Sequence, residues 1–324
     1  GDSDLFSGSY NTVVGSYAAS KNTLKDFSEN TVIGHKAASG ATSMSANVII
    51  GEKAAMSATT ASYNTIIGHE AGYDVTTATE NTYIGYNSGR VNNANYNVVV
   101  GNGALETATG VANSVIIGRQ AAGAAAATGD DNVIVGYKAG YDLTSGYGNA
   151  VVGNDALGNL TEGYSNVGVG NDALFSLTTG RKNIAVGNQA GYSANGTGAV
   201  FIGEYAGGNS TANYNVIIGY QAGDALTSAG DIVAIGEQAL GSDQTGGNNV
   251  AIGREAMRDT GNGTHNVAVG GNALSMGSAA VLGTVAIGYG AGYYTEGNYN
   301  TYIGYKSGYG NSTTQTDQYN TAVG

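Results

Sequence analysis

The sequence predicts an all-β protein, a parallel β-solenoid (β-roll) of about 18 coils with a period of about 17 residues. Three observations lead to this prediction. A short motif recurs along the whole chain, its apolar residues alternate as they do in a strand, and proline is absent from all 324 residues. The repetition is closest between NTYIGYNSG at Asn81–Gly89 and NTYIGYKSG at Asn300–Gly308.

A glycine that follows Val or Ile marks each repeat, and we call it the anchor glycine. Nineteen anchors occur at intervals of 16 to 20 residues, usually 17. They are Gly15, Gly34, Gly51, Gly68, Gly85, Gly101, Gly118, Gly136, Gly153, Gly170, Gly187, Gly203, Gly219, Gly236, Gly253, Gly270, Gly288, Gly304 and Gly324. Because units of a repeat array pack only on their neighbours, we expect one repeat-array domain over residues 1–324, as a segment of a longer chain.

Each unit reads as four successive elements. A strand of about four residues such as NVIIG comes first, because Val and Ile are restricted at χ1 and favour the pleated sheet. The anchor glycine then makes a turn, a short segment with a small residue follows, and a polar turn such as YDLTSGYG ends the unit. Proline would remove backbone donors that each coil needs for the next. Stacked at the sheet spacing, these coils would form a rod about 85 Å long.

The motif also suggests which side chains fill the coil. We expect the Val or Ile before each anchor to point inward, as at Ile117 and Ile252, together with the Val or Thr two residues earlier. Ala or Ser stands three residues after every anchor that has such a position, and only a small side chain would fit a narrow coil there. Asn stands four residues before fifteen of the nineteen anchors, and we expect it to form a hydrogen-bonded ladder between coils.

In this orientation, the residue two before the anchor would point outward. That position is apolar throughout, although a solitary solenoid would expose it to water. Strands that are apolar on both faces are normally covered on both. We therefore expect another copy of the chain to cover this column, which includes Ile49, Ile66, Ile116, Ile134 and Ile217.

Composition argues against several classes of partner. There are 24 acidic residues against 12 basic ones, so a nucleic-acid partner is not expected. Cysteine is absent, which excludes disulfides and thiolate metal sites. No run of about 18 apolar residues occurs, so we expect no membrane insertion in this segment.

Catalytic and cofactor motifs are missing. HEAGY at His69–Tyr73 begins like a zinc-protease motif but lacks the second histidine. Glycine-rich phosphate loops and a G-x-S-x-G elbow do not occur in complete form. His35, Glu52 and His69 each follow an anchor in three successive coils, and we expect a solvated column there. We therefore predict no enzyme activity and no catalytic, cofactor-binding or metal-binding residues.

Several repeats resemble a known family. SVIIGRQAAG at Ser114–Gly123, NVAIGREAM at Asn249–Met257 and NVAVGGNAL at Asn266–Leu274 are similar to the head repeats of trimeric autotransporter adhesins of the YadA type. NTYIGYKSGYGNSTT and NIAVGNQAGYSANGTG also resemble the repeat tracts of phage tail fibres. This resemblance implies a left-handed parallel β-roll, a parallel homotrimer, an extracellular, cell-surface or virion location, and adhesion to a cell-surface protein or glycan.

The resulting hypothesis is a structural fibre or adhesin segment that holds or presents a receptor-binding surface. The first alternative is the shaft of an extracellular filament without a receptor. A third is an ice-binding solenoid, because ten coils from Thr23 to Thr227 place threonine eight residues after the anchor. Turn chemistry explains that column more simply. Tyrosines recur one and five residues after anchors, where packing between coils is favoured over ligand contact.

Overall fold

The fold is given by a computed structural model that describes residues 8–21, 26–124, 126–242, 245–276, 280–310 and 316–324. The chain divides into two compact units, residues 1–164 and 165–324. Both are all-β solenoids without helices in their described residues, and each coil contributes one three-residue strand. The predicted all-β parallel solenoid is thereby confirmed, whereas its homotrimeric assembly and a single domain over 1–324 stay predictions.

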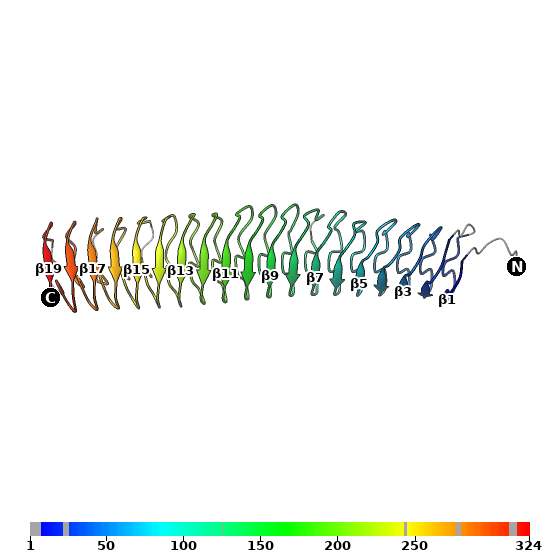
Figure 1. The fold of residues 1–324 in the computed structure, drawn as a ribbon, viewed down its shortest axis with the longest axis horizontal. Helices are drawn as coiled ribbons and strands as arrows, with labels where there is room; N and C mark the ends of the chain where they lie inside the picture. Colours follow the sequence, from blue (N-terminus) through cyan, green and yellow to red (C-terminus); the bar gives the residue numbers. More distant parts are fainter. Residues whose placement is uncertain (1–7, 22–25, 125, 243–244, 277–279, 311–315) are drawn as a thin grey trace. The chain divides into compact units, whose positions relative to one another are not determined.

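The first unit contains nine parallel strands, each paired in register with the next (Figure 1). They are β1 (Thr12–Val14), β2 (Thr31–Ile33), β3 (Val48–Ile50), β4 (Thr65–Ile67), β5 (Thr82–Ile84), β6 (Val98–Val100), β7 (Val115–Ile117), β8 (Val133–Val135) and β9 (Ala150–Val152).

The second unit repeats this arrangement with ten strands, also parallel and in register. They are β10 (Val167–Val169), β11 (Ile184–Val186), β12 (Val200–Ile202), β13 (Val216–Ile218), β14 (Val233–Ile235), β15 (Val250–Ile252), β16 (Val267–Val269), β17 (Val285–Ile287), β18 (Thr301–Ile303) and β19 (Thr321–Val323).

The side of the strand that faces the interior is opposite to the one expected. Ile117 and Ile252, which should have pointed inward, are each 37% exposed. The middle residue of the strand, two before the anchor, is the buried one. The column expected to face another chain therefore lies inside the coil: Ile49, Ile66, Ile116, Ile134 and Ile217 are at most 1% exposed.

The asparagine column explains this orientation. The Asn side chain four residues before the anchor is turned into the coil, and because strand side chains alternate, the residue two before the anchor shares its side. The expected ladder is confirmed. Asn47 donates from Nδ2 to Oδ1 of Asn30 at 2.9 Å and to the carbonyl of Ala61 at 3.0 Å, while its backbone N–H donates to the same Asn30 oxygen at 3.1 Å.

Two further columns complete the core. Ala or Ser three residues after the anchor is buried in every coil from Ala37 onward, as expected. The next residue, four after the anchor, is also buried but varies in size, and it compensates for the middle residue of the strand. Tyr83 is paired with Gly89, where a Cβ would lie 2.8 Å from the tyrosine ring, whereas Gly168 is paired with Leu174. In these two coils a large side chain at one position is thus matched by glycine at the other, which keeps the interior close-packed.

This compensation predicts a rescue in the coil of β12. Phe201→Ala should leave a cavity and cost about 3–5 kcal/mol, and Gly207→Leu alone should overpack the coil, because a Cβ at Gly207 already overlaps the Phe201 ring. The double variant should recover most of the loss, since it recreates the natural pair Ala234 and Leu240. Urea unfolding of all four proteins measures the coupling. Strictly additive losses would contradict the pairing.

Candidate functional site

The outer face of the sheet is uniform in composition in each unit. We define the outer sheet face as the first and third residues of every strand. In β1–β9, seventeen of these eighteen residues are Val, Ile or Thr, with Ala150 the exception, and in β10–β19 all twenty are. None is charged. Contiguous apolar surface of this kind on a soluble protein normally marks an interaction site.

Exposure along this face is substantial. Ile84, Ile117, Val133 and Val152 are 36–44% exposed, which is high for aliphatic side chains in a parallel sheet. Their β-branched side chains form two straight ranks because the strands pair in register. The sequence shows this β-branched pattern. Because the strand was expected to face the other way, these positions were assigned to the core.

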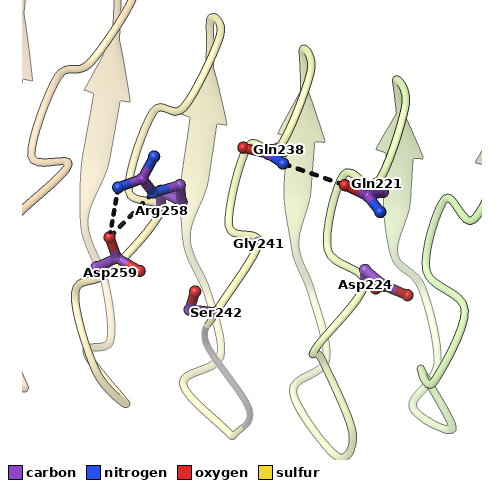
Figure 2. Close-up of a pocket in the computed structure, with 7 residues that line it drawn as sticks. All are labelled: Gln221, Asp224, Gln238, Gly241, Ser242, Arg258 and Asp259. Atoms are coloured by element: carbon purple, nitrogen blue, oxygen red, sulfur yellow. Dashed lines mark hydrogen bonds and ion pairs between the residues drawn. The ribbon is translucent and has the colours of Figure 1, made fainter.

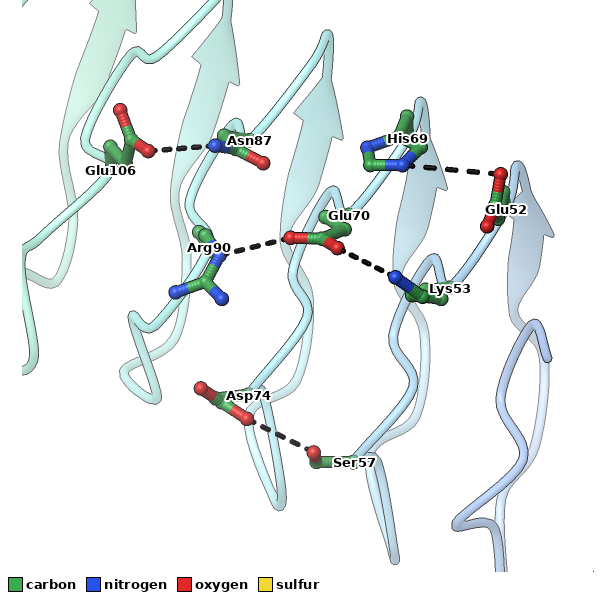
Figure 3. Close-up of polar contacts among 9 residues, drawn as sticks. All are labelled: Glu52, Lys53, Ser57, His69, Glu70, Asp74, Asn87, Arg90 and Glu106. Atoms are coloured by element: carbon green, nitrogen blue, oxygen red, sulfur yellow. Dashed lines mark hydrogen bonds and ion pairs between the residues drawn. The ribbon is translucent and has the colours of Figure 1, made fainter.

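A column of histidine, glutamate and tyrosine follows the anchor glycines in the first unit, and Figure 3 shows two of its members, Glu52 and His69. His35 Nδ1 lies 3.7 Å from Glu52 Oε1, and His69 Nε2 lies 4.0 Å from Glu52 Oε2, so the three residues align as expected. His69 also stacks on Tyr86 with ring centroids 5.2 Å apart.

This column is poorly arranged for a metal ion. Glu52 separates two histidines that stand two coils apart, about 10 Å along the stack, whereas two imidazoles on one zinc ion each need an N–Zn distance of about 2.0–2.1 Å. His69 Nδ1 is buried without a hydrogen-bond partner and so lacks the orienting contact of a typical metal ligand. In the described parts of the chain, no group of three or more His, Cys, Asp or Glu residues has a metal-binding arrangement.

Charged residues on the adjacent columns join neighbouring coils (Figure 3). The Glu70 carboxylate accepts hydrogen bonds from Lys53 Nζ at 3.1 Å and from Arg90 Nε at 3.4 Å. The hydrogen bond from Lys53 lowers the pKa of Glu70, and the same bond raises the pKa of Lys53. Asn87 Nδ2 likewise donates to Glu106 Oε1 at 2.7 Å. Because each contact links one coil to another, these pairs favour a role in coil stacking.

The second unit carries an open polar hollow of about 350 Å³ (Figure 2). It is lined by Gln221, Asp224, Gln238, Gly241, Ser242, Arg258 and Asp259. Arg258 is bound to Asp259 and Glu255, both at 2.9 Å, so its guanidinium is already neutralised within the protein. Partial burial raises the pKa of Asp224. The described residues that line this hollow include no histidine, lysine or cysteine that could form a nucleophile–base pair.

Tyrosine and threonine columns mainly make contacts between coils. Tyr293 and Tyr309 stack with centroids 4.9 Å apart, and such stacking supports the packing interpretation of the tyrosines. Thr42 and Thr144 donate their hydroxyls to carbonyls of the next coil, at 2.9 Å each. These bonds support a turn role for the threonine column. Thr23 lies outside the described residues.

Comparison with protein-family models and with curated protein sequences found no match to this chain. A search of the described residues found no helical segment with the length and hydropathy needed to span a membrane.

Proposed function

We propose that the chain is a structural fibre segment, extracellular, cell-surface or virion-associated, of the tail-fibre or trimeric-adhesin type. Its task would be to hold or present a receptor-binding surface. The observation that carries the proposal is the outer sheet face, a rank of β-branched residues that continues through all strands of each unit without a charged residue. An outer face of such uniform composition in every repeat suggests that it binds another surface along its whole length.

A second copy of the same chain is the proposed occupant of this face. A partner of different sequence would need to match the spacing of the coils, whereas an identical chain in parallel register has that spacing already. Self-complementary apolar faces also close readily around a symmetry axis. Three copies are the number implied by the resemblance to the YadA-type heads. Self-association thus remains part of the proposal, but on the first and third strand residues in place of the middle one.

The proposal includes no catalytic role, no cofactor and no nucleic-acid partner. The first alternative, a filament shaft without a receptor, shares the same face and the same self-association. Binding of the chain to cells or glycans separates the two.

Sedimentation equilibrium tests the self-association. The wild-type chain is expected at three times its mass of 32.4 kDa. A triple variant with Ile84, Ile117 and Val152 changed to Lys should sediment as a monomer, because three buried ammonium groups per chain cannot be paired across the interface. Its β-sheet circular dichroism should persist.

The matched control places three lysines at exposed turn positions, Thr60, Ala126 and Ser145, and should keep the wild-type mass. A wild-type monomer at micromolar concentration, or a face variant that retains full oligomeric mass, would overturn the proposal.

A further inference from the structure

A second hollow, in the first unit, has a composition that the coil contacts do not explain. Its volume is about 320 Å³ and it is open to solvent. It is lined by Thr128, Gly129, Asp130, Asp131, Ser145 and Tyr147. These residues belong to the polar turns that precede β8 and β9, away from the outer sheet face.

The ring of Tyr147 forms one wall of this hollow. One ring face stacks on Tyr164 of the following coil, with centroids 4.9 Å apart and planes at 6°. Apart from Ser145, which belongs to the same turn as Tyr147, the other lining residues come from the preceding coil, at Thr128–Asp131, so we infer that the opposite ring face is turned toward the hollow. Tyr147 remains 49% exposed. A tyrosine ring covered on both faces would be less exposed than Tyr147.

The backbone around Tyr147 is fixed. Gly146 donates its N–H to the Thr161 carbonyl at 3.0 Å, and Gly148, at φ 62°, donates to the Asp130 carbonyl at 3.1 Å. Stacking on Tyr164 then sets the plane of the ring. A platform that is ordered before ligand arrives loses little entropy on binding.

Two aspartates, Asp130 and Asp131, also line the hollow. Asp130 Oδ1 accepts the N–H of Ala112 at 2.8 Å, which orients this carboxylate. Asp131 is exposed and has a positive φ of 60°. Thr128 and Ser145, both exposed residues that carry hydroxyls, line the same hollow. The hollow therefore offers an apolar ring face, negatively charged acceptors and hydroxyl groups within one small volume.

We propose that this hollow binds a neutral saccharide. The C–H face of a pyranose ring packs on an aromatic face, and its hydroxyls donate to carboxylates in charge-assisted hydrogen bonds. The two aspartates would repel anionic sugars and phosphates. A cationic ligand would also be attracted to them, but cation recognition is usually built from several surrounding rings, and this hollow has one.

The proposal deepens the fibre function by naming a receptor class, and it rests on that function for its biological role. Binding itself does not require self-association, because the hollow lies within single-chain turns. The two proposals can therefore fail separately.

Saturation-transfer NMR on the whole chain tests the site. The probes are the methyl glycosides of glucose, galactose and mannose, with the methyl glycoside of sialic acid and choline as charged comparisons. At least one neutral glycoside should bind. Tyr147→Ala should weaken it roughly tenfold, whereas Tyr147→Phe, which keeps the ring face, should stay within about threefold of wild type.

Two further variants complete the experiment. Asp131→Asn keeps a residue that tolerates positive φ and should weaken binding severalfold by removing a charged acceptor. Tyr63→Ala removes another exposed tyrosine, 64% exposed, from a different coil and should leave binding unchanged. The inference is overturned if no neutral glycoside binds, if choline or sialoside binds in its place, or if Tyr147→Ala binds like wild type. Saccharide binding by a wild-type chain that sediments as a monomer would uphold this site although self-association had failed.

Discussion

Ile116→Asp is expected to lower the stability of the first unit by at least about 4 kcal/mol at pH 7. The native side chain is fully buried between the Asn side of the coil and the alanine column, and no partner for a carboxylate lies there. The introduced carboxylate must either remain charged in an apolar interior or take up a proton at pH 7. Both lower the free energy of unfolding. Thermal and urea unfolding followed by circular dichroism measure the loss.

The adjacent residue in the same strand provides the control. Ile117→Asp introduces the same group on the outer sheet face, at a side chain that is 37% exposed. We expect its β-sheet signal to persist, with the change confined to self-association. Equal stability of the two variants, or a larger loss at residue 117, would show that the interior and exterior columns are assigned the wrong way round.

Gly118→Ala is expected to cost about 3 kcal/mol or more. The anchor has φ 141°, a conformation that side-chain-bearing residues rarely adopt, and an added Cβ would overlap the carbonyl of Gly136 in the next coil. Both problems arise from backbone atoms, so no side chain can move to relieve them. The melting temperature should fall accordingly.

Gly110→Ala in the polar turn before β7 is the matched comparison. A Cβ at Gly110 meets no atom within 4 Å, and its φ is not positive. The substitution should be neutral or slightly stabilising, because it reduces the freedom of the unfolded chain. If Gly118→Ala and Gly110→Ala have the same melting temperature, close stacking of the anchors is not the reason that glycine is required.

The fold could be predicted from the sequence because the same motif recurs nineteen times. A fixed anchor glycine, a β-branched residue before it and the absence of proline leave few alternatives to stacked parallel coils. The asparagine ladder followed from the same regularity. These features depend on backbone hydrogen bonding, which the repeat period alone specifies.

The orientation of the strand was mispredicted because uniform hydrophobicity was taken as the sign of a core. The buried column is the variable one: it ranges from Gly168 to Tyr83, and the extreme sizes are balanced by the residue six positions later, as in Leu174 and Gly89. Reciprocal variation of this kind is the signal of a packed interior. The sequence held a second signal. The middle residue of the strand comes two positions after the Asn, so both side chains point to the same side of the strand.

The saccharide hollow could not have been predicted in the same way. Tyr147 and Asp130 occupy equivalent positions of successive coils, but nothing in the repeat shows that the ring is covered on one face and open on the other. That difference depends on Tyr164 stacking from one side while smaller residues of the preceding coil leave space on the other. It is a property of three successive turns and not of the motif.

Cysteine cross-linking tests the central claim, that the outer sheet face is where copies of the chain meet. The chain has no cysteine, so Ile117→Cys and Ile116→Cys each carry a single thiol. A short bismaleimide should join folded chains through residue 117, whereas residue 116 should react only after urea unfolds the coil. Cross-linking through residue 116 in the folded protein, or a residue 117 thiol that labels freely while the chain stays monomeric, would contradict the account.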